Sequence, residues 1–106
     1  MSRMVADPLV DRVVRRIAEH VRPDRIILFG SRARGTGRPD SDIDLVVIYS
    51  GPKSEREVSL EIHRLFPHPE FSMDLFVMRP EDLDSRRHVA NTLAREVSEH
   101  GVVCYG

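Results

Sequence analysis

The stretch from Gly30 to Val47, GSRARGTGRPDSDIDLVV, constrains the fold of this 106-residue chain more than any other part. An apolar run leads into the pair Gly30-Ser31, and ten residues further on Asp42 and Asp44 open a second apolar run. Two carboxylates in an apolar strand are costly unless a cation meets them. Because hard divalent cations prefer carboxylate oxygens, the stretch predicts a metal beside the two aspartates and a phosphate at the Gly-Ser turn.

A third aspartate completes a recognisable pattern. Asp74 lies inside a later apolar run, SMDLFV, at residues 72–77. Gly-Ser, ten residues, Asp-x-Asp and a later strand aspartate together resemble the signature of the nucleotidyltransferase superfamily of DNA polymerase β. More narrowly, the chain is similar over nearly its whole length to the minimal nucleotidyltransferase (MNT) family of prokaryotes. The three parts together are specific, whereas any one of them alone is a weak signal.

Length and composition indicate one domain, residues 1–106, of ordinary globular character. The formal net charge of -1 argues against a general nucleic-acid binder, which usually carries a strong basic excess. Cys104 is the single cysteine, which excludes an internal disulfide and agrees with a reducing cytoplasm. No apolar run approaches a membrane span, and the N-terminus has no signal-peptide pattern, so a cytoplasmic protein is expected.

Periodicity and capping residues predict alternating helices and strands. Strands are expected at residues 25–29, 42–48, 73–78 and 102–105. A first helix is expected from Pro8, capped by Asp7, and a brief second helix from Ser31 to near Gly35 or Gly37. A third is expected after Ser54, which forms a capping box with Glu57. A last helical region is expected from Pro80 to about His100, with Gly101 as its terminator. The predicted core positions of the last region are Leu83, Val89, Leu93 and Val97.

The order of these elements predicts an α/β fold with a small mixed β-sheet and flanking helices, as in the polymerase β-type nucleotidyltransferase fold. A long helical crossover between the second and third strands implies that they pair in parallel. The shorter connection between the first two strands favours antiparallel pairing. Under this topology Ser31, Asp42, Asp44 and Asp74 meet at one end of the sheet.

Three carboxylates at one site repel one another and demand a cation. The resemblance implies a two-metal site in which Asp42 and Asp44 bind both ions, while Asp74 completes the catalytic ion and accepts the proton of the attacking hydroxyl. Mg²⁺ is the expected metal, since it commonly bridges carboxylates and triphosphate oxygens. The alternative is a capped or salt-bridged surface strand without a metal.

Gly30, Ser31 and Arg32 are the predicted nucleotide-binding residues. Ser31 begins a short helix, where backbone N–H groups favour anions, so it should hold the β- and γ-phosphates. A simple helix-capping serine is the alternative. One of Arg32, Arg34 and Arg38 would neutralise the leaving pyrophosphate, against the alternative of a solvated charged face.

The resemblance implies transfer of a nucleoside monophosphate, AMP from ATP, to a hydroxyl with release of pyrophosphate. MNT proteins are commonly paired with all-helical HEPN ribonuclease toxins, so the expected acceptor is a tyrosine of such a partner. Two alternatives stay open: a non-enzymatic antitoxin that neutralises its partner by binding, and a small-molecule (antibiotic) nucleotidyltransferase. Neither membrane nor direct nucleic-acid binding is expected, and a homo-oligomer is a further alternative.

Overall fold

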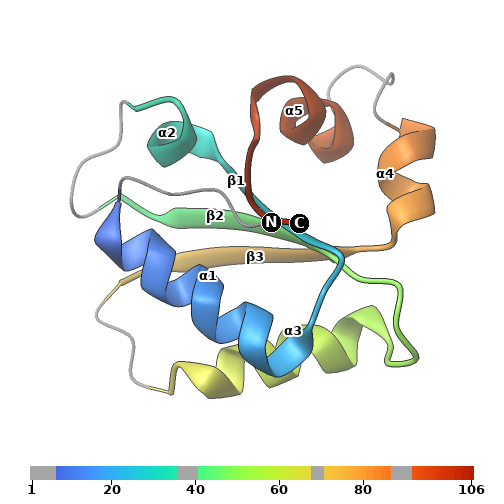
Figure 1. The fold of residues 1–106 in the computed structure, drawn as a ribbon. Helices are drawn as coiled ribbons and strands as arrows, with labels where there is room; N and C mark the ends of the chain where they lie inside the picture. Colours follow the sequence, from blue (N-terminus) through green and yellow to red (C-terminus); the bar gives the residue numbers. More distant parts are fainter. Residues whose placement is uncertain (1–6, 36–40, 68–70, 87–91) are drawn as a thin grey trace.

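The structure, a computed structural model, describes residues 7–35, 41–67, 71–86 and 92–106. Within these ranges helices and strands alternate (Figure 1). The elements in chain order are α1 (Pro8–Val21), β1 (Arg25–Phe29), α2 (Gly30–Ala33), β2 (Ile43–Ile48), α3 (Glu55–Leu65), β3 (Met73–Met78), α4 (Pro80–Arg86), α5 (Leu93–His100) and β4 (Val102–Tyr105). The predicted α/β class is confirmed.

The four strands form one mixed sheet in the order β3-β2-β1-β4. As predicted, β2 pairs with β3 in parallel and with β1 in antiparallel orientation. The register places Asp44 opposite Phe29 of β1 on one side and opposite Asp74 of β3 on the other. The last strand, β4, completes the sheet by pairing antiparallel with β1.

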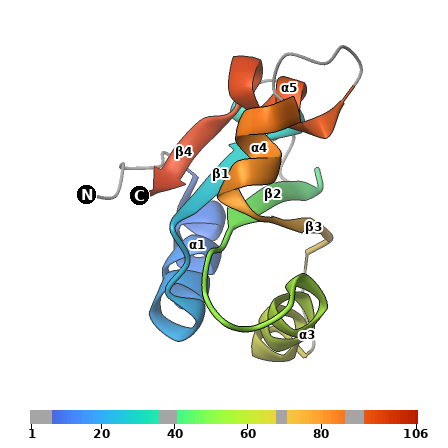
Figure 2. The ribbon, with the colours of Figure 1, turned by 90° about the vertical axis from the view of Figure 1, so that its right-hand side faces the viewer.

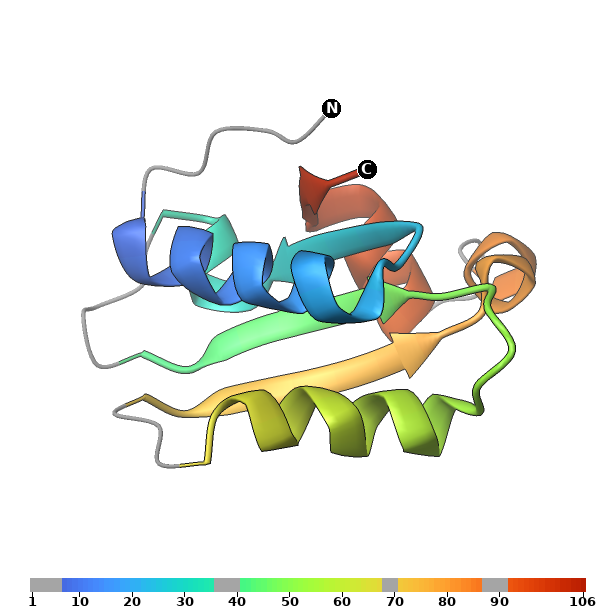
Figure 3. The ribbon, with the colours of Figure 1, turned by 60° about the horizontal axis from the view of Figure 1, so that its bottom comes forward.

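Helices cover both faces of the sheet. Figures 1 and 3 show α1 and α3 side by side on one face, and Figure 2 shows α4 and α5 on the opposite face. Alternate residues of β2 therefore enter two separate cores. Ile43, Leu45 and Val47 contribute to the core under α1 and α3, whereas Val46 and Ile48 contribute to the core under α5. Such burial on both faces explains why β2 is a continuous apolar run after its aspartates.

The predicted helix starts have the expected local chemistry. The Asp7 side chain accepts hydrogen bonds from the backbone N–H groups of Leu9 and Val10. Ser54 and Glu57 form the predicted capping box at the start of α3. These caps satisfy N–H groups that have no partner inside a helix.

The predicted helical region from Pro80 to about His100 contains two helices rather than an uninterrupted one. Thr92 has an extended backbone conformation and its side chain accepts a hydrogen bond from Arg95 N–H, so a new helix, α5, begins after it. Val89, a predicted core residue, lies outside the described residues. Gly101 ends α5 as predicted; a Cβ at this position would lie 2.4 Å from the Val97 carbonyl oxygen. Across the described residues, every helix is too short or too polar to cross a membrane.

Candidate active site

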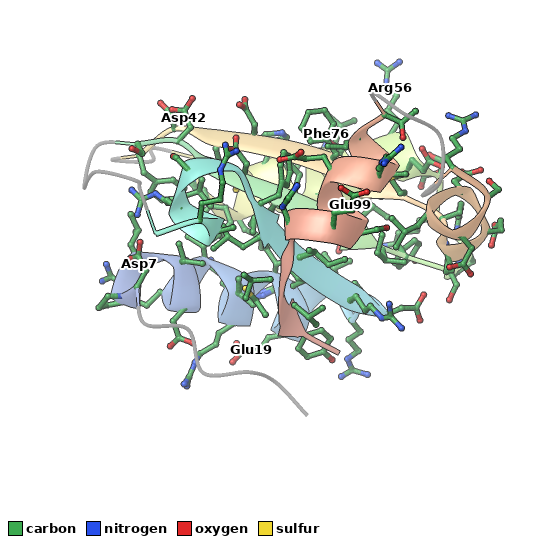
Figure 4. All side chains as sticks on the ribbon, turned by 90° about the horizontal axis from the view of Figure 1, so that it is seen from above. Asp7, Glu19, Asp42, Arg56, Phe76 and Glu99 are labelled. Atoms are coloured by element: carbon green, nitrogen blue, oxygen red, sulfur yellow. The ribbon has the colours of Figure 1, made fainter. Side chains whose placement is uncertain are left out.

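The three predicted aspartates come together at one end of the sheet. Asp42 immediately precedes β2, and Asp44 and Asp74 are register partners on the neighbouring parallel strands β2 and β3. Register partners point to the same face of a sheet, so the two carboxylates emerge side by side. Asp42 is exposed near the α2 end of the molecule (Figure 4), and Asp74 is exposed as well.

The electrostatics of the site follow from this convergence. Burial is the largest cause that raises the pKa of Asp44, from 3.8 to about 6. The hydrogen-bonding contact with the Asp74 side chain and the negative charges of Asp74 and Asp42 raise this pKa further. Asp44 thus binds a proton more tightly than an isolated carboxyl does, because burial and the neighbouring carboxylates disfavour its charged form.

Gly30 brings the backbone of the Gly-Ser turn against this carboxylate. Its φ is +75°, in the left-handed region that residues with a Cβ rarely adopt. A Cβ at this position would lie only 2.2 Å from Oδ2 of Asp44. Both the backbone angle and the close approach therefore require glycine between the end of β1 and the acidic cluster.

Ser31 is the second residue of α2, because that helix begins at Gly30. The N-cap position belongs to Phe29, which makes no capping hydrogen bond with its side chain. The alternative of a simple capping serine is therefore wrong. The reason is the positive φ of Gly30, which turns the chain into the helix one residue before Ser31.

Arg32 is a largely buried side chain, only 7% exposed, and not part of a solvated face. Its guanidinium forms an ion pair with Asp7 and donates a hydrogen bond of 2.9 Å from Nε to the carbonyl oxygen of Ser41. It thereby ties the start of α1 to the residue just before Asp42. These contacts position the acidic cluster, and nucleotide binding by Arg32 stays a prediction.

The two other arginines of the Gly-Ser segment differ from Arg32. Arg34 is exposed, as the solvated-face alternative expects, and its backbone N–H donates to the Gly30 carbonyl oxygen. Arg38 lies outside the described residues.

The link from Asp7 to Arg32 was missed by sequence reasoning, because the capping role of Asp7 gives no sign of a second partner far along the chain.

The donor set of the acidic cluster fits a divalent cation. In the part of the chain that the structure describes, no three His, Cys, Asp or Glu side chains form a group that could hold a metal ion by themselves. Mg²⁺ is commonly held by one or two carboxylates, with phosphate oxygens and waters completing its shell. The adjacent Asp44 and Asp74, with Asp42 beside them, supply that number of carboxylates.

Comparison with protein families gives a match over most of the chain. The family described as "Nucleotidyltransferase domain" matches residues 10–99. Among curated proteins no significant match is found.

Solved structures show the same fold. A toxin–antitoxin complex with AMP-PNP is similar with a TM-score of 0.59 and 21% identity, covering 91% of this chain and 73% of the other. A mutant of the toxin–antitoxin MntA-HpeT is similar with a TM-score of 0.58 and 18% identity, covering 91% of this chain and 73% of the other. A proposed nucleotidyltransferase from Sulfolobus solfataricus is similar with a TM-score of 0.58 and 22% identity, covering 90% of this chain and 75% of the other. At these identities the likeness concerns the fold.

Proposed function

Because this chain belongs to the nucleotidyltransferase domain family, we propose that it transfers AMP from ATP to a hydroxyl and releases pyrophosphate. The observation that carries this proposal is the pairing of Asp44 with Asp74 beside the glycine turn at Gly30. Carboxylates on two strands and a close backbone turn are the parts that metal-assisted phosphoryl transfer needs. ATP as the nucleotide rests on the resemblance alone.

In this proposal Asp42, Asp44 and Asp74 hold Mg²⁺, which would neutralise charge on the triphosphate. Ser31 and the Gly30 turn hold the β- and γ-phosphates, and Arg32 keeps the Ser41 segment in place next to them. A carboxylate oxygen of Asp74 accepts the proton of the attacking hydroxyl. Asp74 suits this role because its exposed side chain can be reached by an acceptor from solution.

The acceptor proposed is a tyrosine of a helical HEPN-type toxin, with the chain acting in the cytoplasm as its antitoxin. Support comes from the motif resemblance and from the fold shared with toxin–antitoxin structures, one of them with AMP-PNP. An open, exposed Asp74 also favours a macromolecular partner that closes the site. The second candidate is neutralisation of the partner by binding alone, which the same shared fold supports.

Incubation with the protein of the neighbouring gene, Mg²⁺ and ATP separates the two candidates. Transfer predicts that the neighbour gains the mass of one or more AMP units, and that Asp74→Asn prevents this gain while the pair still associates. Neutralisation that survives substitution of Asp42, Asp44 and Asp74, without any mass change in the wild type, would instead establish the binding-only role. Modification of a small hydroxylated compound in place of the neighbour would point to the antibiotic-type activity.

A further inference from the structure

Strand β3 is an edge of the sheet in the described part of the chain. The backbone carbonyls of Ser72 and Met78 accept hydrogen bonds from the β2 side, at Ile43 N–H and Tyr49 N–H. Backbone groups alternate in direction along a strand, so the even-numbered residues of β3 face β2. The N–H and C=O groups of the odd-numbered residues Met73, Leu75 and Val77 therefore point out along the open edge.

Among the described residues of this edge, Asp74 at its start is the single charged side chain that could oppose strand addition. Natural edge strands are protected by lysine, proline, bulges or short length. The strand Met73–Met78 has neither lysine nor proline, and its six residues pair with β2 without a register shift. Phe76 on this strand is 43% exposed, although the centroid of its ring lies 6.0 Å from the centroid of the Phe29 ring.

The open edge forms the floor of a groove of about 420 Å³. Side chains from both faces of β3 line it, including Leu75 and Val77 from one face and Phe76 from the other. One wall comes from the start of α3 with Arg56, and the other from the end of α4 and the start of α5 with Arg86. A groove with a strand edge as its floor and helices as its walls is suited to an extended peptide.

Apolar surface continues from the groove along α3. Leu60 is 46% exposed, and it lies one turn after Arg56, so the two share a face of the helix. Figure 4 shows Phe76 and Arg56 on the same side of the molecule as Asp42, whereas Asp7 and Glu19 lie on the opposite side. The groove and the acidic cluster thus share one side of the molecule.

The charges of the groove favour a partner with acidic residues. Within the described ranges neither the Arg56 nor the Arg86 side chain takes part in an ion pair, and Glu55 is the single acidic residue of the lining. A second copy of the chain would set its own Arg56 and Arg86 against these two, and like charges repel. A partner segment with acidic and apolar residues meets both walls without that repulsion.

We propose that the β3 edge is the docking groove for a non-helical segment of the partner, which carries acidic and apolar residues and adds to the sheet as an extended strand. Successive side chains of such a segment point to opposite faces, so one acidic residue can reach Arg56 and the next can reach Arg86. Either direction of the added strand brings part of the segment beside Asp74, at the start of β3. Resting on the proposed function, this places the acceptor hydroxyl at the proton-accepting carboxylate.

Selection of peptides on the intact chain tests the docking without a known partner. A random decapeptide library displayed on phage is selected against the wild-type protein, and the enriched peptides are synthesised with a fluorescent label. Affinity is then measured by anisotropy for each peptide and for two versions, one N-methylated at the odd-numbered and one at the even-numbered backbone nitrogens, because only one of these sets faces the edge. Loss of several edge hydrogen bonds should weaken binding about tenfold or more. The wild-type protein suffices for this comparison, so it does not depend on a variant that must fold.

Charge reversal provides the matched test of the walls. The single variants Arg56→Glu and Arg86→Glu should each lose affinity for the acidic peptides, whereas Arg64→Glu, which changes the net charge by the same amount, should keep it. Arg64 is also on α3 and exposed, but it does not line the groove. In addition, Val77→Pro should weaken binding because it removes one of the outward N–H groups. The variant should still fold, since proline is tolerated on an edge strand.

Enriched acidic and apolar peptides that bind in this manner support the proposal. Failure to enrich any peptide, enrichment of basic sequences, or undiminished affinity of both N-methylated versions would overturn it. Sedimentation gives a further outcome against it: a dimer that Val77→Pro makes monomeric would assign the edge to a second copy. Tyrosine peptides that bind but gain no AMP from Mg²⁺ and ATP would leave the docking intact and count against the proposed transfer.

Discussion

Replacing Asp44 by asparagine should stabilise the protein at neutral pH and have little effect on stability near about pH 4. The pKa of Asp44 is raised from 3.8 to about 6 in the folded state, chiefly by burial and then by Asp74 and Asp42. The folded chain therefore holds this proton more tightly than the unfolded chain. The penalty of ionising Asp44 is complete above about pH 6, shrinks as the pH falls, and is gone below 3.8.

The size of this effect can be bounded. A carboxyl pKa that rises from 3.8 to about 6 disfavours the folded state by at most about 3 kcal/mol above that range. The Asp44 side chain is only partly buried, so solvent screens much of the repulsion. We expect a gain in the free energy of unfolding of about 1 kcal/mol for Asp44→Asn near neutral pH.

Urea unfolding followed by circular dichroism, with EDTA present, measures this gain at about pH 7.5 and about pH 4. Comparison of variant and wild type at each pH cancels the titration of other groups. Asp84→Asn is the matched control, since Asp84 is an exposed aspartate of α4 outside the site. Equal gains for Asp44→Asn at both pH values, or a loss of stability near neutral pH, would refute the reasoning.

Three further substitutions test the surroundings of the site. Gly30→Ala should cost more stability than Gly35→Ala in thermal melts, because both glycines have positive φ but only the first has no room for a Cβ; equal losses would contradict the close approach. Asp7→Ala should destabilise by about 3 kcal/mol, since it removes both the N-cap of α1 and the carboxylate that pairs with the buried guanidinium of Arg32, whereas Asp11→Ala should cost less than about 1 kcal/mol because the arginine it pairs with is exposed; similar costs would mean that the cap and the buried pair contribute little. Ser31→Ala should weaken ATP binding by about 1.5–3 kcal/mol and AMP binding less, and an equal loss for both nucleotides would contradict the assignment to the β- and γ-phosphates.

Much of the fold could be predicted because local signals and topology agree. The parallel pairing of β2 with β3 follows from the helical crossover, and the caps at Asp7 and Ser54 follow from side-chain chemistry. The convergence of Asp44 and Asp74 was predictable for the same reason. Each aspartate lies near the start of an apolar run, and the crossover makes these two strands parallel neighbours whose starts lie at the same end of the sheet. Their register as direct neighbours comes from the structure.

Contacts between distant segments could not be predicted from one sequence. Nothing near Arg32 indicates that its guanidinium meets Asp7, because the pairing depends on how α1 and α2 pack in three dimensions. The break before α5 left a usable signal, since Thr92 is a favoured N-cap residue, but the helical periodicity on either side of it concealed the interruption. The open edge of β3 likewise depends on the strand order and not on any motif.

Calorimetry of ATP binding tests the central claim most directly. If the carboxylates of Asp42, Asp44 and Asp74 form a metal-dependent nucleotide site, ATP should bind weakly in EDTA and much more tightly with Mg²⁺, because three negative charges repel an unaccompanied triphosphate. The Asp44→Asn variant should lose most of the Mg²⁺-dependent gain while remaining folded. Equal affinity for ATP in EDTA and in Mg²⁺, or an undiminished gain in the folded variant, would contradict the account.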